Sequence, residues 1–194
     1  IATHNSGKLR EFFQILSGGP FELTDLESEG ISDDVAETGY TFEENAVLKA
    51  TAYRDLSGLA TLADDSGLMV AVLDGRPGMR SARYAGERAT DDENANKLLG
   101  EMLAVPASQR AARFQCVVAV AIPGREVATF TGSVEGTIAE KPRGEGGFGY
   151  DPVFALSDSL DGGMTMAQLS PLEKSKLSHR GLAAASAAAW LRSL

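Results

Sequence analysis

The stretch ARFQCVVAVAIPGREVATFTGSVEGTIA, residues 112–139, decides which fold is expected. Two long runs rich in Val, Ile, Thr and Phe, residues 112–122 and 126–139, are typical of β-strands. Pro123 and Gly124 lie between the runs and favour a reversal of the chain. We therefore expect these two strands to form an antiparallel pair.

Helical patterns occur on both sides of this pair. Helices are predicted over residues 8–17, 41–58, 90–103 and 172–194. The first has apolar residues at helical spacing and could be capped by Asn5 or Ser6. Thr41 and Thr90 are each followed three residues later by glutamate, which is the spacing of a capping box. The run of alanines in the last segment indicates close packing of that helix.

Two shorter apolar runs predict further strands. LATLAD (59–64) reads as a short buried strand that runs into Asp64-Asp65-Ser66-Gly67, and LMVAVLDG (68–75) follows it. Since strands and helices alternate along the chain, the expected class is α/β (α+β) with a mixed central sheet. We find no repeat, low-complexity tract or linker, so residues 1–194 are expected to form a single domain.

Composition excludes several kinds of function. The net charge of −9 over 194 residues argues against sequence-independent binding of nucleic acid, which depends on cationic side chains. A small anionic ligand stays possible, because a few lysines or a divalent cation can invert the local field. Cys116 is the only cysteine, so a reducing cytoplasm is the expected compartment. The absence of a signal peptide and of any apolar stretch near 18 residues argues against a membrane protein.

The Asp64-Asp65 pair is a candidate for carboxylate chemistry. Adjacent strand residues point to opposite faces, so the two carboxylates should have different roles. A carboxylate at a strand end suits Mg²⁺, although an ordinary Asx turn explains the same sequence equally well. Glu37 could add a further carboxylate, or it could be a solvated loop acid. Lys49 is either an exposed helical lysine or a cation that faces the same site as Asn45, four residues earlier.

Two later segments suggest ligand binding. The glycines of GEGGFGYDPVF (144–154) would let the backbone approach a ligand closely, and Phe148 and Tyr150 could stack on a nucleobase or plug the base of the loop. SPLEKSKLSHRGLA (170–183) carries a cationic cluster that includes Lys174, His179 and Arg180. Such a cluster is usually solvated, but its donors could also read carbonyl oxygens or hold phosphates.

THNSGK (3–8) looks like part of a phosphate-binding P-loop. The P-loop pattern fails, because Ala2 replaces its first glycine and Leu9 replaces the hydroxyl residue after the lysine. Lys8 nevertheless follows a turn into a helix, and a helix N-terminus favours anions.

These segments together resemble a known family. THNSGK, ETGYTFEENAVLKA, LADDSGLMVAVLDGRPGMRSARYAG, GGFGYDPVF and EKSKLSHRG, in this order, closely resemble the inosine triphosphate pyrophosphatase family of house-cleaning nucleotide hydrolases, also described as dITP/XTP pyrophosphatases. The resemblance covers Thr3 to about Leu182. It implies hydrolysis of ITP, dITP and XTP to the monophosphate and pyrophosphate with Mg²⁺, which keeps deaminated purines out of DNA and RNA. It also implies a homodimer with an elongated mixed sheet and two lobes around a deep nucleotide-binding cleft.

The resemblance assigns roles to individual residues. It implies that Asp65 is the proton acceptor and a magnesium ligand, with Glu37 as a second acidic group near the metal. Lys8 and Lys49 would neutralise the leaving pyrophosphate, which makes Lys8 a catalytic as well as a binding residue. The implied substrate contacts are Thr3, Asn5, Lys8, Lys49, Ser66, Phe148, Gly149, Tyr150, Asp151, Lys174, His179 and Arg180.

Two alternatives stay open. A Maf-like pyrophosphatase would act on other modified nucleotides, including pyrimidines. A nucleotide-binding module would hold a purine nucleotide without releasing pyrophosphate. No residue in the sequence identifies the group that would exclude the 2-amino group of guanine.

Overall fold

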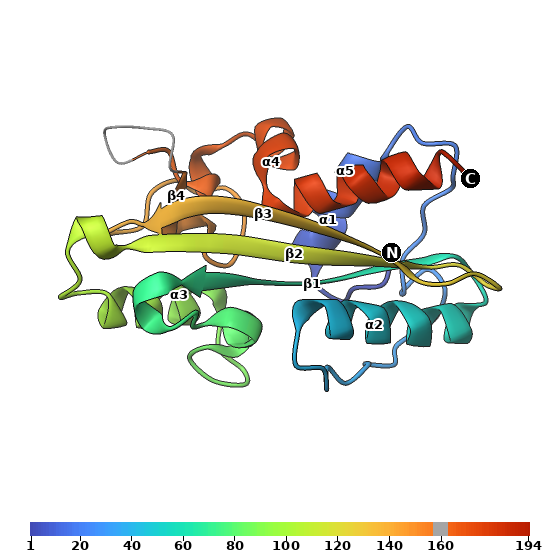
Figure 1. The fold of residues 1–194 in the computed structure, drawn as a ribbon, viewed down its shortest axis with the longest axis horizontal. Helices are drawn as coiled ribbons and strands as arrows, with labels where there is room; N and C mark the ends of the chain where they lie inside the picture. The colour runs from blue at the N-terminus through green and yellow to red at the C-terminus, as the bar shows by residue number, and fades with distance from the viewer. Residues whose placement is uncertain (157–162) are drawn as a thin grey trace. The chain divides into compact units, whose positions relative to one another are not determined.

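The computed structural model describes residues 1–156 and 163–194 of the chain (Figure 1). Its helices and strands follow one another in the order α1 (Ser6–Leu16), α2 (Phe42–Ser57), β1 (Thr61–Val70), α3 (Asp91–Glu101), β2 (Ala111–Ala121), β3 (Ala128–Ile138), β4 (Phe154–Leu156), α4 (Pro171–Leu177) and α5 (His179–Leu191). Short 3-10 turns occur between several of them. The mixture of helices and strands confirms the expected class.

The four strands form one sheet in the order β1-β2-β3-β4. The two long strands predicted to pair, β2 and β3, are neighbours in it. The strand β4 continues the sheet and pairs with β3 in antiparallel register, with Thr137 opposite Ala155.

The chain divides into two compact units, which agrees with the expected two lobes. Unit 1 consists of residues Ile1–Asp65, Cys116–Gly132 and His179–Leu194. Unit 2 consists of Ser66–Gln115 and Ser133–Ser178. Each of the three long strands contributes residues to both units. The single-domain assignment stays a prediction.

The core of unit 1 fixes the position of the last helix. Helices α1 and α5 lie side by side (Figure 1), and four alanines of α5, Ala183, Ala184, Ala187 and Ala188, are buried in a core that also contains Phe12 and Val118. Gly132 on β3 permits this approach, since a Cβ there would lie 2.2 Å from the carbonyl oxygen of His179. The small residues therefore bring the first turn of α5, with His179 and Arg180, close to the strand.

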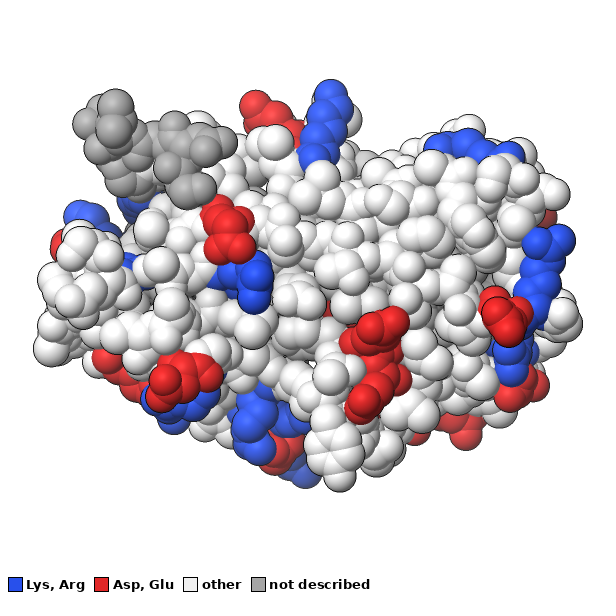
Figure 2. Space-filling model, viewed as in Figure 1, with Lys and Arg blue, Asp and Glu red and all other residues white. Residues whose placement is uncertain are grey.

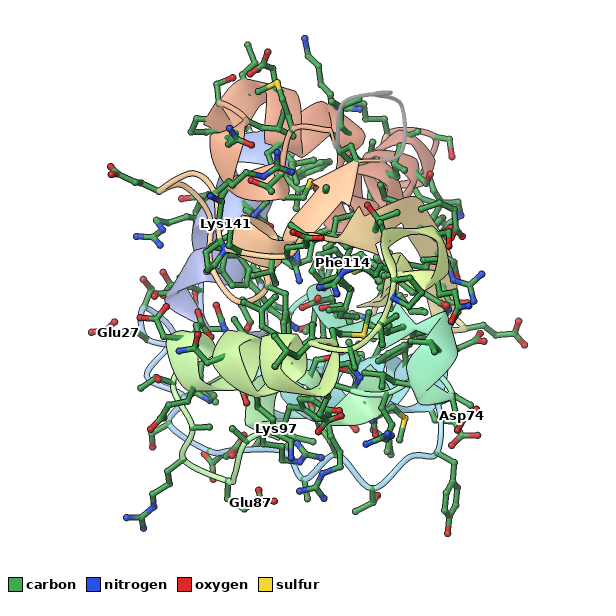
Figure 3. The ribbon with its side chains drawn as sticks, turned by 90° about the vertical axis from the view of Figure 1, so that its left-hand side faces the viewer. Glu27, Asp74, Glu87, Lys97, Phe114 and Lys141 are labelled. Atoms are coloured by element: carbon green, nitrogen blue, oxygen red, sulfur yellow. The ribbon has the colours of Figure 1, made fainter. Side chains whose placement is uncertain are left out.

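The core of unit 2 packs α3 against its strand segments. Phe114 and Phe154 contact each other with ring centroids 4.6 Å apart, among buried residues that include Leu98 and Met102. Phe114 lies among the interior side chains in Figure 3, whereas Glu87 lies at the edge of the molecule. The buried Arg110 guanidinium donates to the carbonyl oxygens of Met102, Ile138 and Ala139, so backbone acceptors satisfy it.

Three sequence predictions need correction. The run 68–75 is not a separate strand, because its first residues belong to β1, which ends at Val70, and Ala71–Leu73 form a 3-10 turn. The strand predicted to end at Asp64 continues, since β1 runs unbroken from Thr61 to Val70 through Asp64-Asp65-Ser66-Gly67. The turn alternative is therefore wrong, because burial on both sides of the strand outweighs the turn preference of these residue types. The helix predicted over 172–194 is two helices, separated at Ser178, whose backbone is extended and whose N–H caps α4.

The other helix predictions are confirmed. The Asn5 side chain caps α1 by accepting a hydrogen bond from the N–H of Lys8, and the Thr41 side chain caps α2 by accepting one from the N–H of Glu44. The capping box of Thr90 is complete at the start of α3. Among the described residues, no helix combines the length and the apolar character needed to cross a bilayer.

Candidate active site

The N-terminus of α1 presents a polar turn and a lysine. The Asn5 Oδ1 atom accepts from the N–H of Lys8 at 2.9 Å, and the Thr3 Oγ1 atom accepts from the N–H of Asn5 at 3.2 Å. The first turn of this helix contains no acidic residue. Its unsatisfied N–H groups and partial positive charge thus suit an anion. The Lys8 ammonium turns towards β1, where its Nζ lies 3.1 Å from Asp64 Oδ2.

Asp64 is the fully buried centre of an ion-pair network. Besides Lys8, its Oδ2 atom lies 3.3 Å from Arg180 Nε and 3.6 Å from Cys116 Sγ. Arg180 also donates to Glu11 Oε2 at 2.7 Å. Burial alone would raise the pKa of Asp64, but the charges of Lys8, Arg180 and Lys49 outweigh it and hold that pKa well below its usual value. Asp64 is therefore a fixed anion, and it orients Lys8.

Asp65 lies in a different environment. Its Oδ2 atom accepts from Asn45 Nδ2 at 3.0 Å, and its Oδ1 atom lies 4.0 Å from Lys49 Nζ. Lys49 also contacts Glu37 Oε1 at 2.5 Å. Burial, with a contribution from Glu37, raises the pKa of Asp65 above its usual value, although Lys49 and Asn45 oppose the shift. A carboxylate with a raised pKa is a better proton acceptor.

The two adjacent aspartates thus differ in partners and in chemistry. Strand alternation predicted separate partners, and they have them: Asp64 contacts Lys8 and Arg180, and Asp65 contacts Asn45 and Lys49. One carboxylate is held ionised as a counter-ion. The other, Asp65, has a raised pKa, which suits proton transfer, and carboxylate oxygens that suit a divalent cation.

The glycine-rich segment of unit 2 is held by carboxylates. The buried Asp151 accepts from the N–H of Phe148 at 2.8 Å and from the ammonium of Lys174. That ammonium also lies 4.7 Å from the centre of the Phe148 ring. Gly147 has φ +75, and a Cβ there would lie 2.0 Å from Asp151 Oδ2, so the position requires glycine. These contacts give the segment one defined shape.

Tyr150 and Gly149 have different surroundings from Phe148. Tyr150 is buried in the core of unit 2, and its hydroxyl donates to the carbonyl oxygen of Ser81 at 2.8 Å. Its ring is thus an anchor of the loop, which matches the plug alternative for this residue. The N–H of Gly149 donates to Asp91 Oδ2, in the first turn of α3, at 2.8 Å. The predicted contacts of these residues with substrate stay predictions.

The structure brings the predicted residues together in two groups. In unit 1 lie Thr3, Asn5, Lys8, Glu37, Lys49, Asp65, His179 and Arg180. In unit 2 lie Ser66, Phe148, Gly149, Tyr150, Asp151 and Lys174. Of the first group, His179 and Arg180 are buried, and the Arg180 guanidinium is occupied by Asp64 and Glu11.

Sequence reasoning missed three residues that hold these groups. Glu11 is three residues after Lys8 on α1, a spacing that could have indicated a shared face. Cys116 was interpreted only for its redox state, although its thiol reaches Asp64. The only sequence signal for Asp91 is that it is an acid in the first turn of a helix. The helix dipole already explains an acid at that position, so the signal did not indicate a contact with the loop.

The carboxylates of Glu37 and Asp65 fit a divalent cation. Both approach the same Lys49 ammonium, and carboxylate oxygens are the ligands that Mg²⁺ prefers. Among residues 1–156 and 163–194, no group of three or more His, Cys, Asp or Glu side chains is arranged to hold a metal ion. Mg²⁺ commonly takes only one or two protein carboxylates and completes its shell with water and phosphate.

Figure 2 shows the charged side chains on one face of the molecule. Acidic and basic side chains are interspersed among other residues on the face shown in Figure 2. The described residues of that face do not form a continuous basic track of the kind that binds nucleic acid.

Comparison with known proteins is consistent with these features. The model of the Ham1 family matches residues 1–190. The dITP/XTP pyrophosphatase of Bacillus subtilis is 50% identical over 93% of this chain and 89% of its own length. That of Geobacillus kaustophilus is 54% identical over 94% of this chain and 88% of its own length.

Solved structures give the same result. The Ham1 protein of Staphylococcus aureus has a TM-score of 0.85 at 42% identity and covers 99% of this chain and 96% of its own. A HAM1 protein from Coxiella burnetii has a TM-score of 0.87 at 39% identity, with coverage of 100% and 97%. The chain belongs to the Ham1 family.

Proposed function

We propose that the protein hydrolyses the non-standard purine nucleotides ITP, dITP and XTP to the monophosphate and pyrophosphate. The observation that carries this proposal is the pair of adjacent buried aspartates flanked by Lys8 and Lys49, in which the pKa of Asp64 is lowered and the pKa of Asp65 is raised. Relatives that share about half of their residues with this chain are named dITP/XTP pyrophosphatase.

In the proposed reaction, the α1 N-terminus and the ammonium groups of Lys8 and Lys49 bind the triphosphate. A water molecule attacks the α-phosphorus, and Asp65 accepts its proton. The new bond joins the water oxygen to the α-phosphorus, while the bond from that phosphorus to the bridging oxygen breaks and pyrophosphate leaves. Preorganised cations act most strongly where charge develops, so the lysines lower the barrier.

Glu37 and Asp65 would hold Mg²⁺. When bound, Mg²⁺ would polarise the phosphate oxygens and offset the charge of the leaving pyrophosphate. The geometry that supports this is the approach of both carboxylates to one ammonium group.

We assign recognition of the base to the loop Phe148–Asp151 and to Lys174, with His179 and Arg180 as further contacts. The Phe148 ring suits stacking on a purine, and the fixed shape of the loop would reduce the entropy lost on binding. The Arg180 guanidinium is bound by Asp64 and Glu11, so we assign its main effect to the orientation of Asp64 and Lys8.

We further propose a homodimer that works in the cytoplasm. The family resemblance supports the dimer, and Tyr40, Leu48 and Leu56 in unit 1 expose apolar side chains that an interface could cover. The single buried cysteine suits a reducing compartment. Analytical ultracentrifugation tests the dimer directly, and a monomer at micromolar concentration would contradict it.

A substrate panel tests the function. Pyrophosphate release would be measured with Mg²⁺ for ITP, dITP, XTP, GTP, ATP, dUTP and dTTP, and with the Asp65→Asn variant as the control for contaminating activity. We expect ITP, dITP and XTP to be turned over far faster than the others. Equal rates on the pyrimidine nucleotides would favour the Maf-like alternative. Tight ITP binding without pyrophosphate release would favour a binding module.

A further inference from the structure

The Lys49 ammonium lies where a metal ion would be expected. Its Nζ atom is 2.5 Å from Glu37 Oε1 and 4.0 Å from Asp65 Oδ1, the two carboxylates assigned to Mg²⁺. The Lys49 side chain is only 13% exposed. A cation of this chain thus already offsets part of the negative charge of the two acids.

The surrounding residues hold this arrangement in place. Asn45, one turn before Lys49 on α2, donates to Asp65 Oδ2 and accepts from the N–H of Gly39. Asn45 therefore links Asp65 to the segment that carries Glu37.

An ammonium group and a divalent cation compete for the same oxygens. A lysine is a compact point charge on a flexible stem, so it can leave one anion for another without any change in the backbone. A divalent cation close to this ammonium would also be repelled by it. Lys49 must therefore move away before both carboxylates can coordinate a metal ion.

We propose that Lys49 is an exchangeable counter-ion, which occupies the Glu37–Asp65 pair in the nucleotide-free protein and transfers to the phosphates of an arriving nucleotide. The free protein then binds a divalent cation weakly, and the metal enters together with the nucleotide. The inference rests on the proposed function for the identity of the arriving anion. It adds to that function an order in which the ligands bind. The metal ion does not precede the nucleotide, because the triphosphate provides the anion to which the Lys49 ammonium transfers.

Lys8 provides the matched comparison. It is a second partly buried lysine in the same unit, but its ammonium pairs with Asp64 and belongs to a separate set of contacts. Removal of Lys8 takes away the same unit of charge without vacating the Glu37–Asp65 pair. Comparison of the Lys49 and Lys8 variants therefore distinguishes two effects on metal binding. One is removal of the ammonium that occupies the Glu37–Asp65 pair, and the other is the loss of one positive charge nearby.

The test measures Mn²⁺ binding to the nucleotide-free protein, by the electron paramagnetic resonance signal of free Mn²⁺, at pH 8. We expect Lys49→Met to bind Mn²⁺ about tenfold more tightly than the wild type or better, as removal of a nearby cation predicts. Lys8→Met should change the affinity by less than about threefold, and Lys49→Arg should bind as weakly as the wild type. The double variant Lys49→Met/Glu37→Gln should lose the gain.

Equal Mn²⁺ affinity of the wild type and Lys49→Met would overturn the proposal. An increase in Mn²⁺ affinity in Lys8→Met as large as that in Lys49→Met would also overturn it. Thermal unfolding of each variant checks the fold, and Lys49→Gln replaces Lys49→Met if the latter does not fold. No hydrolysis is measured, so failure of this test leaves the proposed function intact. Likewise, an inactive enzyme would leave the Mn²⁺ comparison interpretable.

Discussion

The charged cluster of unit 1 and the glycine-rich loop of unit 2 position their functional groups by different means. In the cluster, side chains from helices pair with buried carboxylates of a strand, as Lys8 and Arg180 do with Asp64. In the loop, carboxylates accept from backbone N–H groups, as Asp151 does from Phe148. The first arrangement fixes charges and the second fixes the shape of the main chain. Substitutions should therefore affect turnover and stability in the cluster, and affinity for the base in the loop.

The largest expected effect is that of Asp65→Asn. Loss of the proton acceptor should lower kcat for ITP by roughly 10²- to 10⁴-fold, the usual contribution of general base catalysis. ITP binding should be largely retained, because Lys8 and Lys49 stay in place. Single-turnover kinetics and calorimetric binding measure the two quantities. Asp55→Asn, an exposed acid on α2, is the control and should keep wild-type kcat. Near-normal turnover of Asp65→Asn would remove this residue from the mechanism.

Asp64→Asn should instead act mainly on stability. It takes from the partly buried Lys8 its carboxylate partner, and from the buried Arg180 one of its two carboxylates. Removal of one member of a buried ion pair typically costs about 3–5 kcal/mol in the free energy of unfolding. Urea denaturation of the metal-free protein measures the change. A loss no greater than that of Asp55→Asn would show that the network contributes little.

The pH dependence of stability should also distinguish the two aspartates. Burial would raise the pKa of Asp64, but Lys8 and Arg180 outweigh it and lower this pKa in the folded state. The ionised Asp64 therefore stabilises the fold fully above 3.8, its pKa in the unfolded chain, and this stabilisation is lost as the pH falls below that value. Burial raises the pKa of Asp65, so the folded state binds its proton more tightly, and stability falls as the pH rises from 3.8 through the native value.

Urea unfolding across this acid range, in metal-free buffer, tests the opposite signs. Asp64→Asn should flatten the loss of stability below 3.8, and Asp65→Asn should reduce the loss above that value. The same slope in both variants would contradict the assignment of different roles.

In the loop of unit 2, Phe148→Ala should raise KM for ITP and change kcat little. Stacking of a base on an aromatic ring contributes about 1–3 kcal/mol, which corresponds to a five- to 150-fold change in affinity. Tyr150→Phe is the matched comparison, because it removes only the hydrogen bond to the carbonyl oxygen of Ser81. That variant should lose about 1 kcal/mol of stability and keep its KM. A larger rise in KM for Tyr150→Phe than for Phe148→Ala would reverse the roles given to the two rings.

The sequence predicted the regular elements well because local signals determine them. Caps at Asn5, Thr41 and Thr90 mark the starts of three helices, and β-branched runs mark the long strands. The continuation of β1 through Asp64 and Asp65 was missed, because local turn preference competes there with burial that only the folded chain supplies. Long-range packing decided that element.

The contacts that hold the candidate site residues depend on long-range packing as well. Residue types and the family resemblance indicated Lys8, Lys49 and Asp65, but not what orients them. The contact of Arg180 with Asp64 joins residues 116 positions apart, and no spacing in the sequence encodes it. The contact of Asp91 with Gly149 spans 58 positions. Such partners depend on tertiary structure alone.

The smallest expected effect is that of Asp91→Ala. Asp91 accepts a hydrogen bond from the N–H of Gly149 at 2.8 Å, so loss of its carboxylate should cost about 1 kcal/mol and raise KM for ITP roughly fivefold. Asp92→Ala is a close control, because Asp92 is the next residue in the first turn of α3 and interacts with the same helix dipole. Asp91→Asn keeps an acceptor and should retain most of the affinity. An equal rise in KM for Asp91→Ala and Asp92→Ala would mean that the helix charge matters and the contact with the loop does not. A rise confined to Asp91→Ala would show that the loop of unit 2 depends on an acceptor outside it to keep its shape.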